Sequence, residues 1–238
     1  MEGSTNALPQ TGNFRTETQN ELEIVGTAVK FSRLDNTLSR QLHLDKLSSK
    51  LSSVSYITRT LKPILTIENL NLIYYSYVHS IISYGLIFWG NSSQSKIIFK
   101  LQKRIIRIIT NSNYRTTCRD LFKKLNILPL QSQFILSLAL SVVGNLDDFS
   151  INFDLHSFNT PQKFHLHPPP TRMTTYQKGV HYMGVKIFNK IPPKIQCLIS
   201  NKKQFLKTLK KFLLLVSFYT IEEFYNWSSI SDLHAAYT

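Results

Sequence analysis

An apolar stripe with helical spacing between residues 94 and 110 most constrains the fold of this chain. At 100° per residue, its members fall within about 120° of arc: Ile97, Ile98, Leu101, Ile105, Ile108 and Ile109. The opposite face contains basic residues and no acidic ones: Lys96, Lys100, Lys103, Arg104 and Arg107. A solvated helix face usually mixes both signs at i,i+4 spacing. The pattern therefore predicts one face against a core and one face towards anions, with a merely solvated basic face as the alternative.

The rest of the chain favours further helices over a sandwich or barrel. Only 8 of the 238 residues are glycine, whereas all-β folds need many turn residues. Apolar spacing and breakers such as Pro63 and Pro129 predict helices over 44–61, 67–84, 130–143, 175–189 and 201–216. Thr66 is the expected N-cap of the second of these helices, and Thr116 or Thr117 of a short helix before residue 126. We predict a mainly α fold, an irregular helical bundle, with a short β segment near residues 23–31 and a disordered N-terminal leader.

The helix predicted over 201–216 repeats the two-faced pattern. Its apolar side comprises Phe205, Leu206, Leu209, Phe212 and Leu213. Its basic side comprises Lys203, Lys207, Lys210 and Lys211. We expect both basic faces to contact the phosphate backbone of nucleic acid.

Charge is distributed unevenly along the chain. The formal net charge is +14 and the isoelectric point is near 9.8. Residues 69–119 contain 7 basic residues and residues 155–221 contain 11, and neither segment contains an Asp or Glu. Ordinary surface mixes both signs, so a polyanionic partner is the natural interpretation, with RNA or DNA ahead of an anionic membrane. A basic soluble protein without such a partner is the alternative.

The chain offers no convincing catalytic or metal site. Asp147 and Asp148 are adjacent, but a loop after a helix explains them better than a polymerase metal site. His165 and His167 lack an evident third ligand, and Cys118, beside Arg119, lacks a base partner. We therefore expect no enzyme activity, cofactor, metal or small-molecule substrate. The N-terminus is too polar for a signal peptide, which favours an intracellular location, in the nucleus or the cytoplasm.

An aromatic-rich stretch allows two functional interpretations, a membrane span and a base-stacking surface. Residues 72–90 are long enough to span a bilayer, but their serines, tyrosines and histidine favour a buried helix followed by a turn. Tyr74, Tyr77, Tyr84, Phe88 and Trp89 could stack on bases, although their apolar neighbours favour core packing.

Several blocks of the chain resemble one family in order. LDNTLSRQLHLDKLSSKLSSVSYITRTLKPILT resembles the segment that follows the palm in jockey-type non-LTR retrotransposon reverse transcriptases. The next blocks are similar to that family as well: SIISYGLIFWGNSS, IFKLQKRIIRIIT, TTCRDLFKKLNILPLQSQFI, GVKIFNKIPPKIQ and FLKTLKKFLLLVSFYTIEEF. The resemblance covers about residues 29–225.

The resemblance implies a thumb-like helical region and a C-terminal segment that grip a template and primer. Lys103, Arg104 and Arg107 match the family's QKR…R block, which implies contact with phosphates. The family's catalytic palm, endonuclease and fingers have no counterpart in this sequence, and Asp147–Asp148 does not match the catalytic pair. The segment Phe31–Asp35 is two residues short of the family pattern, and Arg40 replaces a usual Trp.

These observations predict a leader of unclear origin over 1–27, a thumb-like region over 28–144, a linker over 145–174, a helical segment over 175–225 and a polar tail over 226–238. The expected function is that of an RNA-directed DNA polymerase fragment that binds RNA or DNA without sequence specificity. The rest of a retrotransposon polymerase is a further expected partner. The alternatives are a basic helical protein-interaction adaptor and a decayed, non-functional reading frame.

Overall fold

The computed structural model of this protein describes residues 40–150, 165–168 and 179–227. Within these ranges the elements are helices and no extended strand occurs, which confirms the predicted mainly α fold. The β segment expected near 23–31 and the leader over 1–27 lie outside the described residues. So do most of the polar tail and the greater part of the linker predicted over 145–174.

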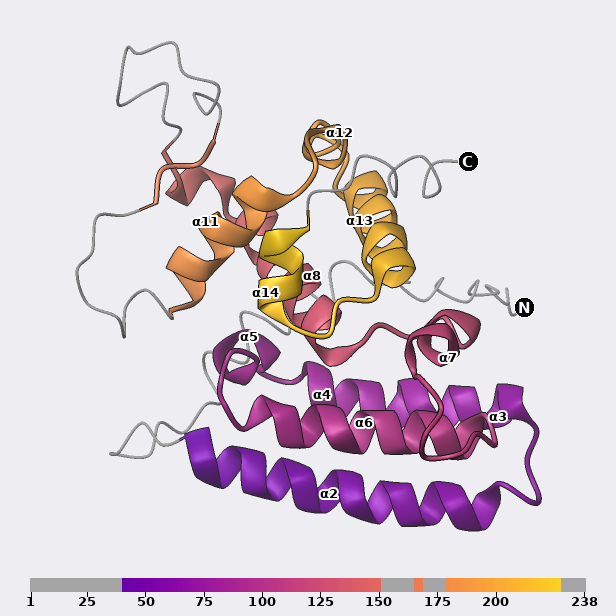
Figure 1. The fold of residues 1–238 in the computed structure, drawn as a ribbon. Helices are drawn as coiled ribbons and strands as arrows, with labels where there is room; N and C mark the ends of the chain where they lie inside the picture. The colour runs from indigo at the N-terminus through magenta and orange to yellow at the C-terminus, as the bar shows by residue number, and fades with distance from the viewer. Residues whose placement is uncertain (1–39, 151–164, 169–178, 228–238) are drawn as a thin grey trace, which may run out of the picture.

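Three helical stretches form one layer of the molecule (Figure 1). They are α2, Arg40–Leu61; a continuous run of α3, Ile67–Ile73, a π-helical turn, Tyr74–His79, and α4, Ser80–Ser83; and α6, Ser95–Ile109. The middle run returns antiparallel, so α2 and α6 run in the same direction (Figure 1). Hydrogen bonds join α2 to α6 at both ends of the two helices. Gln94 donates to Gln41 at their N-terminal ends, and Lys62 donates to Asn111 at their C-terminal ends.

Local sequence explains where these helices end. Pro63 follows α2, and the Thr66 hydroxyl caps α3 by accepting from the Asn69 N–H, as predicted. Gly85 ends α4 with φ of +63°, a conformation that costs glycine little. A short helix that was not predicted follows, α5, Leu86–Trp89. Gly90 then lies so close to Phe134 that a Cβ there would be 2.3 Å from its ring. The left-handed backbone thus explains Gly85, and the close contact with Phe134 explains Gly90.

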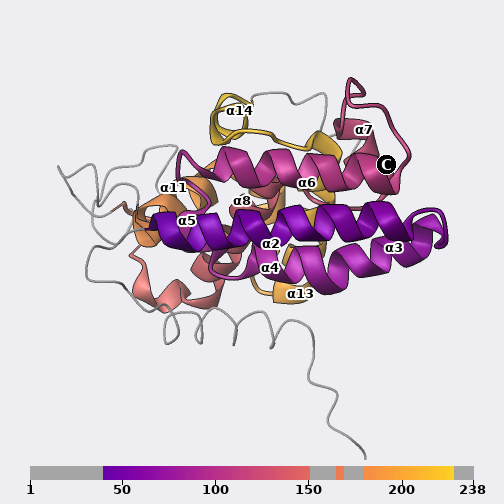
Figure 2. The ribbon, with the colours of Figure 1, turned by 90° about the horizontal axis from the view of Figure 1, so that it is seen from below.

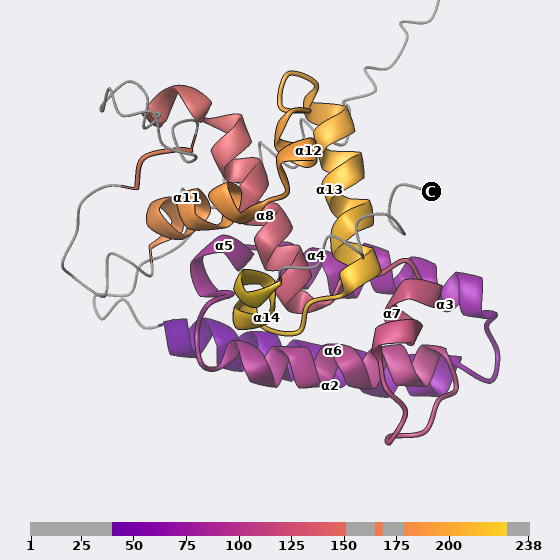
Figure 3. The same ribbon diagram turned by 45° about the horizontal axis from the view of Figure 1, so that its top comes forward.

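The central helix, α8, Leu130–Gly144, contains no charged residue, as expected for a buried helix. It packs against α5 and α6 on one side and against α11, Val180–Lys190, and α13, Lys202–Val216, on the other (Figure 3). The short helices α7, Arg119–Lys124, α12, Pro193–Gln196, and α14, Ile221–Asn226, complete the fold. Residues 40–144 and 179–227 share one apolar core.

The described parts of the predicted linker also lie against this core. Leu166 is buried, and its backbone exchanges two hydrogen bonds with the Asn189 side chain of α11, at 3.0 and 2.8 Å. Phe149 stacks on His181 with ring centroids 4.5 Å apart. The predicted linker therefore contacts α11 at two described positions, Phe149 and Leu166.

The predicted core face of α6 was partly wrong. Ile98, Ile105 and Ile109 are buried, but Ile97 is 51% exposed, and Leu101 and Ile108 are only half-buried. The buried face is rotated relative to the prediction. It also includes the apolar residues Phe99 and Ile106 and the polar residues Ser95 and Gln102. The reason is that α2 and α3 cover one flank of α6 while α7 and α8 cover another. The predicted Thr116 or Thr117 cap was also wrong, because Cys118 precedes α7.

Gln102 is fully buried and joins three parts of the chain. Its Nε2 donates to the Tyr74 hydroxyl at 2.8 Å and to the Leu128 carbonyl at 3.0 Å. Its Oε1 accepts from the Leu130 N–H at 2.9 Å. That N–H belongs to the first turn of α8, which has no partner within its own helix. One amide of α6 thus caps α8 and binds the middle helical run.

We expect Gln102→Leu to destabilise the fold by about 3 kcal/mol. The substitution fills similar space but leaves two backbone groups and one hydroxyl buried without partners, and each such group costs about 1–3 kcal/mol. Tyr74→Phe is the matched control, because it removes one partner only and should cost about 1 kcal/mol. Urea unfolding followed by circular dichroism measures both. A Gln102→Leu variant as stable as the wild type would contradict this role.

Candidate nucleic-acid interface

Three cations of α6 form an exposed row. Lys96, Lys100 and Arg104 follow one another at i,i+4 spacing and are all exposed. Each step along this face rises roughly 6 Å. None of the three forms an ion pair with a carboxylate among the residues that the structure describes. This part of the predicted site therefore faces solvent as a row of unpaired positive charge.

The other two predicted α6 cations have structural partners. The Lys103 Nζ lies 4.5 Å from the centroid of the Phe99 ring and 5.4 Å from that of Tyr219. Partial burial is the main cause that lowers the pKa of Lys103. The Arg107 guanidinium donates to the Thr116 carbonyl at 3.3 and 3.2 Å. These two residues stabilise the packing around α7, so they are less free to meet a ligand than the exposed row.

The four predicted lysines of α13, Lys203, Lys207, Lys210 and Lys211, are also exposed. They do not extend the α6 row, because Figure 2 shows α6 and α13 on opposite sides of α2 and α4. Burial lowers the pKa of His79 to about 4, and the positive charge of Lys210 is the second cause. This lysine of α13 therefore acts electrostatically on the middle helical run, to which His79 belongs. Of the nine predicted cations, the seven exposed ones therefore form two separate surfaces.

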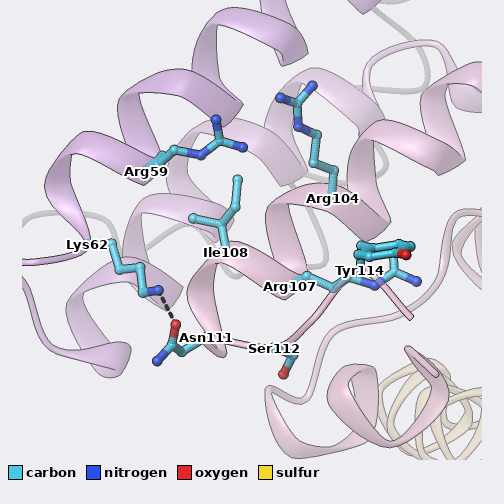
Figure 4. Close-up of a pocket in the computed structure, with 8 residues that line it drawn as sticks. All are labelled: Arg59, Lys62, Arg104, Arg107, Ile108, Asn111, Ser112 and Tyr114. Carbon is cyan, nitrogen blue, oxygen red and sulfur yellow. Dashed lines mark hydrogen bonds between the residues drawn. The ribbon is translucent and has the colours of Figure 1, made fainter. Parts of the chain in front are cut away.

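A pocket of about 510 Å³ lies where α2 and α6 end (Figure 4). Arg59 and Lys62 reach it from the end of α2, and Arg104 and Arg107 from α6. Ile108, Asn111, Ser112 and Tyr114 complete the lining. Sequence reasoning missed the two α2 cations and the loop residues. Their positions at the ends of two helices would have indicated them only if the parallel direction of α2 and α6 had been known.

The turn after α6 shapes this pocket. Asn111 takes a left-handed conformation with φ of +54°, and the Ser112 N–H donates back to the Arg107 carbonyl at 2.9 Å. This arrangement is a common helix ending, in which Asn replaces the more usual Gly. It presents the Asn111 side-chain oxygen to Lys62 and places Tyr114 on the opposite side of the pocket (Figure 4).

Arg119, the last cation of the acid-free segment 69–119, is a structural residue. Its guanidinium donates to both carboxylate oxygens of Glu223 at 2.9 and 3.0 Å and to the Ser217 carbonyl at 3.2 Å. It also lies 4.4 Å from the centroid of the Tyr219 ring. This residue joins α7 to the α13–α14 connection, so it does not belong to the candidate interface.

The weaker chemical candidates stay apart in the structure. Asp147 and Asp148 are exposed on a single 3₁₀ turn, Leu146–Asp148. Among the described residues, no three His, Cys, Asp or Glu side chains are grouped to bind a metal ion. Of the aromatic candidates, Tyr74 and Trp89 are buried in the core, as favoured, whereas Tyr77 and Tyr84 are about half exposed. In the part of the chain that is described, no helix is both long and apolar enough to cross a bilayer.

Comparisons with protein-family models, with curated proteins and with solved structures find no match to this chain.

The two cysteines should differ in reactivity. Cys118 is 2% exposed, and burial raises the pKa of its thiol, whereas Cys197 is exposed. The thiolate is the reactive form, so we expect one fast and one slow thiol in native labelling with a maleimide. Cys197→Ser should abolish the fast phase and leave the slow one. A fast phase that persists in this variant would mean that Cys118 is accessible.

Proposed function

We propose that this chain is the post-palm part of a jockey-type reverse transcriptase and that it binds RNA or DNA without sequence specificity through α6. The observation that best supports the binding proposal is the exposed row of Lys96, Lys100 and Arg104, with no described carboxylate paired to it. The proposed origin rests on the ordered sequence blocks between about residues 29 and 225.

The energetics of the row favour a polyanionic partner. Like charges at i,i+4 on a helix destabilise it by about 0.2–0.5 kcal/mol per pair. The pairs Lys96–Lys100 and Lys100–Arg104 therefore cost less than about 1 kcal/mol in total, which a packed core tolerates. Phosphates along the row would remove this repulsion, and each neutralised phosphate would release condensed counterions.

The competing proposal, a protein-interaction adaptor, also has an observation in its favour. Several large side chains in and next to the layer of α2, α3, α4 and α6 are exposed. Among them are Tyr56 of α2 at 71%, Ile64 between α2 and α3 at 76%, and Leu72 of α3 at 68%. Such residues suit contact with a protein, including the rest of a polymerase. Binding that depends on these residues and is insensitive to salt would favour the adaptor.

Neutralising the α6 row should weaken nucleic-acid binding in a salt-dependent way. We expect the triple variant Lys96→Gln, Lys100→Gln, Arg104→Gln to reduce the slope of log affinity against log salt by about 3, close to one per phosphate contact. At low salt the affinity for a generic duplex should fall about tenfold or more. Fluorescence anisotropy over a salt series measures both quantities.

The matched control removes the same charge from the other surface. Lys203→Gln, Lys207→Gln, Lys211→Gln alters three exposed lysines of α13. The α13 lysines have the same spacing, but only the α6 row continues into the group of cations formed by Arg59, Lys62 and Arg107. We therefore expect the α13 variant to change the salt slope less than the α6 variant does. Equal losses in both variants would contradict a binding site on α6 alone, and absence of binding at micromolar protein would refute the proposal of nucleic-acid binding.

The proposed origin has a separate test in the genome. We expect a reading frame that encodes the palm carboxylates of a reverse transcriptase directly upstream of this one. Neighbouring sequence at several copies of the locus decides the matter. An intact promoter and unrelated host genes on both sides would contradict the proposed origin.

A further inference from the structure

Four positively charged side chains line the pocket between the ends of α2 and α6, more than the two helix ends neutralise. Arg59, Lys62, Arg104 and Arg107 line it, and none of them pairs with a carboxylate in the described ranges. Helix C-termini attract cations, because each carries about −0.5 of an elementary charge. Two helix ends therefore offset about one of the four positive charges. A net charge of about +3 is left at the pocket, which favours an anionic ligand.

The polar groups of the pocket suit a phosphate. Guanidinium groups bind phosphate oxygens through pairs of N–H donors, and Arg59 and Arg104 are both exposed. Ser112 adds a hydroxyl to the lining. Lys62 is held in place by its hydrogen bond to Asn111, which joins the two helix ends (Figure 4). The volume of about 510 Å³ falls within the roughly 300–1,000 Å³ typical of ligand pockets, so more than one phosphate group can enter.

Tyr114 adds an aromatic surface on the same pocket. Its side chain is 76% exposed, although an exposed aromatic residue is normally better placed in a core. Arg115 holds the ring by donating from Nε to the Tyr114 hydroxyl at 2.8 Å, with its guanidinium 5.4 Å from the ring centroid. An exposed aromatic ring next to cations is the arrangement on which single-stranded nucleic acids stack their bases.

We propose that this pocket binds a nucleotide of an unpaired strand, with its phosphate among Arg59, Lys62 and Arg104 and its base stacked on Tyr114. The inference rests on the proposed nucleic-acid binding and specifies the form of nucleic acid. In a duplex the faces of all bases except the terminal pairs are covered by their stacked neighbours, so nearly all bases that can meet Tyr114 are unpaired ones. The chain should therefore prefer single strands over duplexes, whereas the open α6 row accepts either.

The experiment compares a homothymidine strand with a blunt duplex of equal length, using the full chain. We expect Tyr114→Leu to weaken single-strand binding about tenfold, since stacking contributes about 1–3 kcal/mol per base, and to leave duplex binding unchanged. Tyr114→Phe keeps the ring and should bind as the wild type does. Tyr77→Leu is the matched control, because Tyr77 is 50% exposed but does not line the pocket. Unfolding curves confirm that each variant is folded.

Two further arms test the phosphate subsite. Arg59→Gln together with Lys62→Gln should weaken single-strand binding more than duplex binding. Thymidine 5′-monophosphate should displace the strand at concentrations at which inorganic phosphate does not, because only the nucleotide also stacks on Tyr114. Equal displacement by both anions would overturn the stacking part and indicate a simple anion site.

The outcomes separate this inference from the proposed function. If duplex binding depends on salt and on the α6 row, but Tyr114→Leu and the Arg59, Lys62 variant affect both substrates equally or not at all, the pocket inference fails alone. If neither strand nor duplex binds at low salt, the proposed function fails and the pocket inference fails with it.

Discussion

The buried amide of Gln102 joins the parts of this fold that the apolar core alone would not align. Burying a glutamine is costly unless its donors and acceptors are satisfied. Here they bind Tyr74 from the middle helical run and the backbone on both sides of Pro129. Apolar contacts are non-directional, whereas these hydrogen bonds specify how far α6 lies along its neighbours. The direction and register of α6 set the positions of its cations, so the candidate interface depends on this amide.

The register of α6 divides its basic residues into two groups. One group stabilises the fold, because Lys103 and Arg107 contact rings and carbonyls around α7. The other group, Lys96, Lys100 and Arg104, remains exposed. Since α2 runs in the same direction, its final cations meet those of α6 at one end of the layer (Figure 1). This group of cations is therefore formed by two helices whose contributing residues are far apart in sequence.

Local sequence signals predicted most helices because their causes are local. Pro63, the Thr66 cap, Gly85 and the apolar repeat of α13 act within a few residues of the boundaries that they produce. The core face of α6 was predicted less well. Apolar periodicity assigned Ile97 to the core and left Gln102 out of it. Side-chain hydrophobicity does not show that a buried glutamine will find three hydrogen-bond partners elsewhere in the fold. The pocket could not be predicted at all, since periodicity says nothing about whether two helices run parallel.

The sequence by itself determined the mainly helical character, the two-faced helices α6 and α13, and the exclusion of carboxylates from two long segments. These properties follow from composition and from spacing along one helix, which are short-range. The tertiary structure alone decided which cations have structural contacts and which remain exposed. It also decided that α6 and α13 form separate surfaces, and that Arg59, Lys62 and Tyr114 join α6 in one pocket. The physical reason is that burial and charge proximity depend on neighbours brought together by long-range packing, and a single stretch of sequence does not contain them.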